Sequence, residues 1–106
     1  MIQAVQDVSP DEMRQLIDVL RRKQATGLAV MLISSVDGKV QLVAGLSKDL
    51  IERGLHAGNW LKEVAPVVGG GGGGRPDLAQ AGGKSPDKIN TAIEHAARSI
   101  KLGLES

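Results

Sequence analysis

The sequence predicts an α+β fold, in which a single small domain has a mixed β-sheet of about four to five strands with about three helices packed on it. Three observations favour this class. Apolar residues recur at helical spacing in three separate segments. Residues 28–33 form an apolar run without alternation, which is typical of a strand covered on both faces. Asp37-Gly38 joins that run to a second strand-like segment, as in a hairpin turn.

The first strand and the first helix are predicted on either side of a Ser-Pro break. Residues 2–8 contain Val and Ile and precede this break, which predicts a short strand. Ser9 precedes Pro10, and Glu12 follows at the third position, so a helix with a capping box is expected to begin here. The apolar face of this helix is predicted to hold four residues: Met13, Leu16, Ile17 and Leu20.

Residues 28–33 and 39–44 are predicted to be antiparallel neighbours across the Asp37-Gly38 turn. The apolar run 28–33 is expected at the centre of the sheet. A strand, a helix and a strand in that order imply a crossover between parallel strands, whereas the hairpin is antiparallel. The sheet is therefore expected to be mixed.

A second helix is predicted from Ser47 to Pro66. Gly54 and Gly58, one turn apart, would let this helix approach the sheet closely. Its buried stripe is expected to hold Leu50, Ala57, Leu61 and Val64.

The C-terminal part predicts a short strand over 78–81 and a last helix that begins at Ser85-Pro86-Asp87. The face of this helix is the most regular apolar pattern in the sequence: Ile89, Ala92, Ile93, Ala96, Ile100 and Leu104.

Composition excludes several classes of function. The 13 Lys and Arg residues and 12 Asp and Glu residues leave a net charge of +1, so any nucleic acid must be bound locally. There are no cysteines, and two histidines, His56 and His95, are too few for a histidine cluster. One tryptophan is the only aromatic residue, which disfavours stacking on unpaired bases. No apolar run is long enough to cross a membrane, and a cytoplasmic location is expected by default.

The most unusual stretch is a run of six glycines, Gly69 to Gly74. A flexible linker is the ordinary interpretation. However, only about thirty residues follow, too few for an independent core, so the run joins two parts of one fold. We therefore predict an ordered or semi-ordered loop over 69–74. Glycine leaves backbone N–H groups uncovered, which lets a polyanion come close.

Familiar nucleotide-binding motifs do not fit this run. Gly69, Gly71 and Gly74 match the dinucleotide fingerprint in spacing, but that motif follows a strand and this run follows a predicted helix. A phosphate-binding loop ending in Gly83-Lys84-Ser85 would need glycine where Leu78 stands. Covalent catalysis also lacks a cysteine nucleophile.

The glycine run and the residues after it, through Arg75-Pro76-Asp77, 79–83 and Lys84, resemble the signature of the DHH-associated domain in its alanyl-tRNA synthetase form. The flanking segments 56–58 and 66–68 are similar to that family too, and the resemblance covers essentially the whole chain, 1–106. The same superfamily closes DHH phosphodiesterases, in which a histidine is typical where this sequence has Arg75. The motifs of the phosphodiesterase catalytic half are absent here as well.

The resemblance implies the C-terminal globular domain of an alanine–tRNA ligase, without any catalytic domain. In that family the domain binds tRNA near its outer corner and helps bring aminoacylation and editing together on one tRNA. Alanine-specific tRNA and the other domains of the synthetase are the implied partners. No catalytic activity and no cofactor are expected in this domain, because ATP, magnesium and zinc are used elsewhere in such ligases. The helical segment that often mediates dimerisation is not in this sequence, which leaves the oligomeric state open.

The residues expected to contact RNA are Gly70, Gly71, Gly72, Gly73, Gly74, Arg75, Gln80, Lys84 and Lys88. Other interpretations stay open for some of them. Arg75 could form a structural pair with Asp77, Gln80 could hold its strand through the amide, and Lys88 could be a solvated surface lysine. The basic cluster 21–23 is interpreted as a helix C-terminus, where positive charge is favourable. No residue is assigned to catalysis or to a metal.

Two further functions are kept as alternatives. One is the nucleotide-binding half of a DHH-family phosphodiesterase. The other is a protein interaction or dimerisation module in which the glycine loop is only a requirement of the fold.

Overall fold

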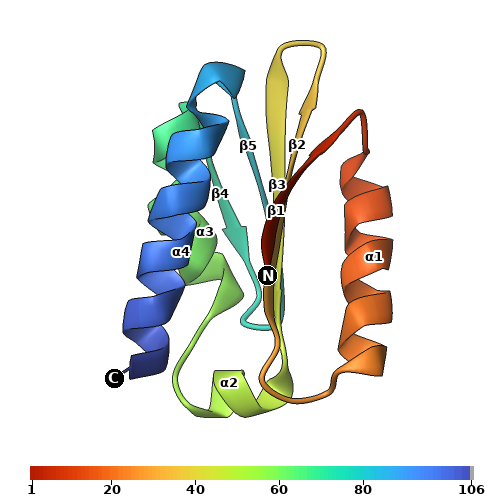
Figure 1. Ribbon diagram of the computed structural model, residues 1–106, viewed down its shortest axis with the longest axis vertical. Coiled ribbons are helices and arrows are strands. Elements are labelled where there is room, and N and C mark those ends of the chain that lie inside the picture. Colours follow the sequence, from red (N-terminus) through yellow and green to blue (C-terminus); the bar gives the residue numbers. More distant parts are fainter. Residues whose placement is uncertain (106) are drawn as a thin grey trace.

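The computed structural model describes residues 1–105 and contains one five-stranded sheet with the strand order β1-β2-β3-β5-β4 (Figure 1). The elements are the strands β1 (Ile2–Gln6), β2 (Ala29–Val36), β3 (Lys39–Leu46), β4 (Gly71–Gly74) and β5 (Leu78–Gly83), the helices α1 (Pro10–Lys23), α2 (Lys48–Glu52), α3 (Ala57–Val64) and α4 (Ile89–Glu105), and the 3-10 turns η1 (Ala65–Val68) and η2 (Pro86–Lys88).

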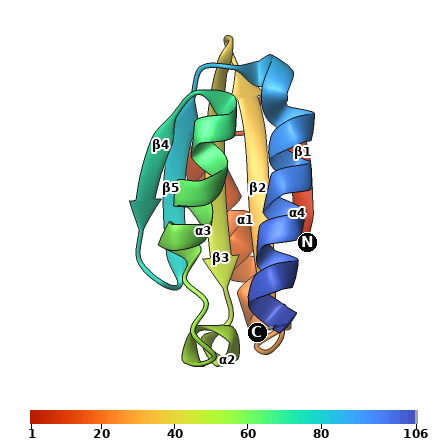
Figure 2. The ribbon, with the colours of Figure 1, turned by 90° about the vertical axis from the view of Figure 1, so that its left-hand side faces the viewer.

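The molecule has three layers, with α1 on one face of the sheet and α3 and α4 on the other (Figures 1 and 2). β1 and β2 are parallel, and the remaining neighbours are antiparallel. One core cluster lies between the sheet and the α3 and α4 layer, and a smaller one lies under α1. The predicted mixed sheet with helices packed on it is confirmed.

β2 is covered on both faces, as its unbroken apolar sequence predicts. Met31 and Ile33 belong to the core under α3 and α4, whereas Val30 and Leu32 belong to the core under α1. The central strand is nevertheless β3, not the apolar run 28–33, because β5 pairs with the free side of β3. The prediction that this run forms the central strand was therefore wrong, because the run lies in β2, next to the centre.

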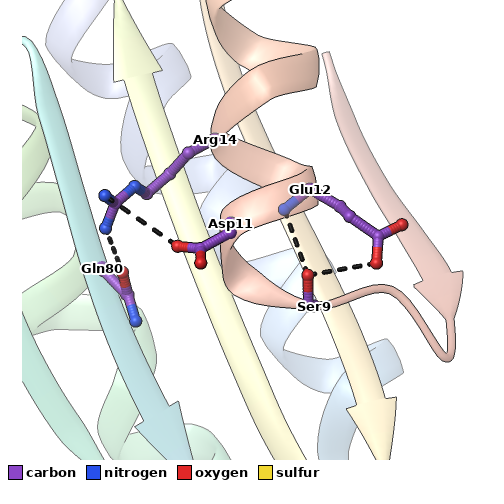
Figure 3. Close-up of polar contacts among 5 residues, drawn as sticks. All are labelled: Ser9, Asp11, Glu12, Arg14 and Gln80. Atoms are coloured by element: carbon purple, nitrogen blue, oxygen red, sulfur yellow. Dashed lines mark hydrogen bonds and ion pairs between the residues drawn. The ribbon is translucent and has the colours of Figure 1, made fainter.

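The start of α1 follows its sequence signals with one change. The Ser9 hydroxyl accepts a hydrogen bond from the Glu12 backbone N–H at 3.2 Å, as an N-cap does. The Glu12 carboxylate accepts from the Ser9 hydroxyl at 3.1 Å and not from the Ser9 backbone (Figure 3). Met13 and Ile17 are fully buried, but Leu16, expected on the same face, is 48% exposed.

The helix predicted over 47–66 is broken into α2 and α3. Gly54 has a φ of 100°, which ends the helical path, and His56 starts α3 by accepting the Asn59 N–H at Nδ1 over 3.1 Å. The close approach expected at Gly54 and Gly58 is confirmed only at Gly58, where a Cβ atom would lie 2.5 Å from the carbonyl oxygen of Gly74, whereas a Cβ atom at Gly54 would meet nothing within 4 Å. Pro66 ends the α-helical segment, as predicted, and lies in η1.

The last helix, α4, packs on the sheet through its small residues. Ala92 and Ala96 are fully buried, and the indole N–H of Trp60 donates to the Ala96 carbonyl at 3.1 Å. Leu104, expected on the buried face, is 37% exposed. The predicted start of this helix, at Ser85-Pro86-Asp87, forms the separate 3-10 turn η2. Lys88 is the last residue of η2, and α4 begins after it, at Ile89.

The glycine run is ordered, as predicted, but Gly71–Gly74 form the strand β4 and not the predicted loop. β4 pairs antiparallel with β5 at the edge of the sheet, and Gly72 stands opposite Ala81. The two backbones lie unusually close: a Cβ atom on Gly70 would lie 1.7 Å from the Gly82 carbonyl oxygen, and one on Gly72 would lie 2.5 Å from the Ala81 Cα atom. Glycine at these positions is therefore a packing requirement.

A hydrogen-bond network joins the start of β2 to the start of α2. The Asp49 carboxylate accepts the Ser47 hydroxyl at 2.6 Å and the Gly27 N–H at 2.9 Å, and the Leu28 N–H donates to the Ser47 hydroxyl at 3.0 Å. The Ser47 hydrogen bond, assisted by the Gly27 N–H, lowers the pKa of Asp49 below its ordinary value against the opposing effect of burial.

Replacing Gly70 with Ala is expected to lower the free energy of unfolding by about 1–3 kcal/mol or more, because the added methyl group overlaps the backbone of Gly82. The Gly71→Ala variant is the matched control: nothing lies within 4 Å of a Cβ atom there, so its stability should change by less than about 0.5 kcal/mol. Urea unfolding monitored through the buried Trp60 measures both. Equal losses in the two variants would contradict this account of the glycine strand.

The Asp49→Asn variant should remove a pH-dependent part of the stability. The lowered pKa of Asp49 means that its contribution is present above the ordinary value of 3.8 and is lost as the pH falls through the folded-state pKa. The free energies of unfolding of wild type and variant should therefore differ near neutral pH and converge once the pH has fallen below the lowered folded-state pKa of Asp49. Glu94→Gln, at an exposed position of α4, controls for the loss of a carboxylate. A gap between wild type and Asp49→Asn that stays constant with pH would refute the prediction.

Candidate nucleic-acid interface

The glycine strand β4 forms one lateral edge of the sheet, beyond β5 (Figure 2). Gly71, Gly72 and Gly74 are exposed, while Gly70 and Gly73 are half-buried. Because none of these residues has a side chain, the peptide groups themselves form the surface here. A ligand can thus approach the backbone more closely at β4 than at an ordinary edge strand.

The glycines of this run differ in what the fold requires of them. Gly70 and Gly72 face the β5 backbone, and Gly74 has a φ of 153°, so a side chain is unfavourable at all three. At Gly73 a Cβ atom would lie 3.1 Å from the flexible Lys62 side chain and at an ordinary contact distance of 3.9 Å from the Gly58 carbonyl oxygen. Gly71 has open space and no positive φ. The packing of this domain therefore gives no reason for glycine at position 71.

Arg75 leaves β4 in a turn that several backbone hydrogen bonds hold. The first N–H groups of α3 donate to it, from Ala57 to the Pro76 carbonyl at 2.9 Å and from Gly58 to the Arg75 carbonyl at 3.3 Å. The Arg75 N–H donates to the Leu78 carbonyl at 3.1 Å. The backbone beneath the Arg75 side chain is therefore fixed on the scaffold.

The Arg75 side chain is 72% exposed and makes the structural pair that the sequence left open. Its Nε atom lies 3.4 Å from Asp77 Oδ1, and Arg21 lies 3.6 Å from the other carboxylate oxygen. Exposed pairs of this kind contribute about 0–1 kcal/mol, so Arg75 can leave Asp77 for a phosphate at little cost. The pair and a contact with RNA are thus compatible.

Gln80 lies on β5 and faces α1. Its Oε1 atom accepts a hydrogen bond from Arg14 Nη1 at 3.1 Å, and Figure 3 shows Arg14 reaching across from α1 to this strand. Ala79 and Ala81, its neighbours in β5, point into the core on the other face. Sequence reasoning missed Arg14, because 66 positions separate it from Gln80 and no local pattern marks it.

A cleft of about 350 Å³ opens between α1 and the β4–β5 turn. Two arginines and an amide, Arg14, Arg75 and Gln80, line it together with parts of the two strands. The remaining lining residues are Gly73, Gly74, Leu78 and Ala79.

Lys84 and Lys88 lie at the opposite end of β5 from Arg75. Lys84 follows the strand and is exposed, and its backbone N–H donates to the Val68 carbonyl at 2.8 Å. The Lys88 backbone N–H donates to the Ser85 carbonyl at 3.0 Å, and its side chain is exposed. Six residue steps from Leu78 to Lys84 correspond to about 20 Å of strand. The predicted residues therefore form two groups, with the glycine strand between them.

Within residues 1–105, no three His, Asp or Glu side chains gather closely enough to hold a metal ion. No helix in the described part of the chain has the length and apolarity needed to cross a membrane.

The sequence matches a known family and several curated proteins. The model of the DHHA1 domain matches residues 1–102. The alanine–tRNA ligase of Rhodopirellula baltica is 53% identical over 97 residues, which cover 90% of this chain and 10% of that protein. The alanine–tRNA ligase of Natranaerobius thermophilus is 54% identical over 87 residues, covering 82% of this chain and 10% of that protein. The chain thus spans about a tenth of the length of these relatives.

The fold also matches a crystal structure, that of the C-Ala domain from Aquifex aeolicus alanyl-tRNA synthetase. The TM-score is 0.79 and the sequence identity is 39%, and the match covers 88% of this chain and 82% of that one. The fold of this domain is therefore shared with a solved C-Ala domain. On the combined evidence of motif, fold and relatives, the chain belongs to the DHHA1 (DHH-associated) domain family, in the form that alanyl-tRNA synthetases carry.

Proposed function

We propose that this chain is an accessory tRNA-binding domain of an alanine–tRNA ligase, which contacts the outer corner of alanine-specific tRNA and helps couple aminoacylation with editing in the cytoplasm. Its membership of the family supports this assignment, since its curated relatives are alanine–tRNA ligases. In this proposal the domain binds RNA but catalyses no step itself and holds no cofactor. ATP, magnesium and zinc serve the other domains of such a ligase, which are its partners within the protein.

The observation that carries the proposal is the exposed edge at Gly71. Glycine in a strand is destabilising, because the unfolded chain loses more conformational freedom there than at other residues. Neither the backbone angle nor the packing requires glycine at Gly71. Close approach of a ligand gives glycine a role at this position. A folded RNA, whose ribose-phosphate backbone carries both charge and hydrogen-bonding oxygens, is the ligand that fits a bare peptide edge with cations at both ends.

Recognition of this kind depends on shape and phosphates more than on base edges. Arg75 lies at one end of the glycine strand, and Lys84 and Lys88 lie at the other, on a domain of net charge +1. Only a few phosphates can be neutralised at once. The isolated domain should therefore bind tRNA weakly and with a shallow dependence on salt, since each neutralised phosphate adds about one unit or less to the logarithmic slope.

The isolated domain is expected to bind whole alanine-specific tRNA in a fluorescence titration and to ignore mononucleotides. A free anticodon stem-loop should compete poorly, because it lacks the outer corner. Preference for mononucleotides would instead favour the phosphodiesterase alternative. A tight dimer in light scattering without any affinity for RNA would favour the interaction module.

The Arg75→Ala and Lys84→Ala variants should each weaken tRNA binding about two- to tenfold and reduce the salt slope by about one unit or less, because each removes a phosphate contact. Lys101→Ala, an equal change of charge at an exposed site on α4, is the control and should bind as wild type does. If both test variants keep wild-type affinity, neither residue belongs to the interface.

The Gly71→Ala variant should weaken tRNA binding about fivefold while its midpoint of thermal unfolding stays unchanged or rises, since the methyl group covers the backbone but meets no protein atom within 4 Å. Titration and thermal unfolding on the same preparation separate the two effects. Wild-type affinity in this variant would show that the glycine edge does not touch the RNA.

A further inference from the structure

The cleft between α1 and the β4–β5 turn brings together polar groups from three distant parts of the sequence. Arg14 comes from α1, Arg75 from the turn and Gln80 from β5, and all three line the same space of about 350 Å³. Arg14 reaches from the helix that covers the neighbouring strands to the strand beside the glycine edge (Figure 3). This hydrogen bond sets the direction of the Arg14 guanidinium group.

The side chains of the cleft offer mainly hydrogen-bond donors to a ligand. An arginine has only donors, so the oxygen of the Gln80 amide must face Arg14 Nη1, at 3.1 Å. The Gln80 nitrogen, with its two N–H donors, then remains for a ligand. Together with the guanidinium groups of Arg14 and Arg75, the side chains of the cleft present donors on more than one wall. Such an arrangement suits an anion with several acceptor oxygens.

Two carboxylates lie near these arginines. Asp11 Oδ1 is 4.0 Å from Arg14 Nη2, with side chains that are 83% and 47% exposed, respectively. Asp77 Oδ1 is 3.4 Å from Arg75 Nε and also faces Arg21. Exposed pairs at such distances are screened by water and salt, so they leave both arginines available. Arg21 further offsets the charge of Asp77.

We propose that this cleft binds a backbone phosphate of the RNA, with Arg14 and Arg75 as contact residues and Gln80 as the residue that positions Arg14. The inference rests on the proposed tRNA-binding function and adds a site to it. The RNA then lies on the α1 side of the glycine edge, where a phosphodiester enters the cleft while the neighbouring backbone passes over β4. Arginine suits this role because its planar fork matches two phosphate oxygens.

The first test is the Arg14→Ala variant in tRNA titrations at several salt concentrations. We expect affinity to fall about five- to twentyfold and the salt slope to decrease by about one unit, since one phosphate contact is lost. Arg14→Lys keeps the charge and should recover part of the affinity. Arg98→Ala, on α4 across the sheet from α1, changes the net charge equally and should leave both values unchanged. Thermal unfolding of each variant checks that the fold is intact.

The second test uses Gln80→Glu, which keeps the shape of the side chain and its contact with Arg14 but places a negative charge in the cleft. It should weaken tRNA binding more than Gln80→Ala does, because a carboxylate repels the phosphate. The proposed phosphate site would be overturned if Arg14→Ala kept the salt slope of the wild type and Gln80→Glu kept its affinity for tRNA. If these variants bind as wild type does while Arg75→Ala and Lys84→Ala are weakened, only this inference fails. If the wild-type domain does not bind tRNA, the proposed function fails and the phosphate site with it.

Discussion

The close contact between the backbones of β4 and β5 is the constraint on which the rest of the structure depends. Side chains are excluded at Gly70 and Gly72 by the β5 backbone, and Gly58 gives the start of α3 the same kind of approach to β4. Gly83 plays the corresponding part at η1, where a Cβ atom would lie 2.5 Å from the Val68 carbonyl oxygen. These contacts place α3 and the turn after β4 in one rigid arrangement, and the direction of Arg75 follows from that turn.

A glycine edge strand is stable only because larger elements support it. β2 and β3 supply buried apolar side chains to cores on both faces of the sheet, and β5 extends this sheet toward the edge. The entropy that six adjacent glycines lose on folding is offset by this scaffold and not by contacts of their own. The same scaffold keeps the edge free of side chains and positions the arginines beside it. Stability and recognition are thus assigned to different strands of one sheet.

The differences between expectation and structure have a common cause. The helix expected over 47–66 shows a continuous apolar stripe, but Gly54 adopts a positive φ and divides it. The glycine run was expected to be a loop that joins two parts of one fold, yet pairing with β5 makes Gly71–Gly74 the strand β4. Leu16 fits the helical period of α1 but lies outside the area that the sheet can cover. In each case a local pattern was overridden by what the neighbouring element left room for.

The sequence by itself determined the class of the fold, the capped start of α1 at Ser9, the hairpin at Asp37-Gly38 and the family, because these depend on short-range spacing and on a long, unusual motif. Only the tertiary structure decided that β3 is central, that Arg75 and Lys84 lie at opposite ends of β5, and that Arg14 joins Gln80. Those facts depend on which strands become neighbours. Strand pairing is set by the free energy of the whole assembled sheet, and no local segment of the sequence contains it.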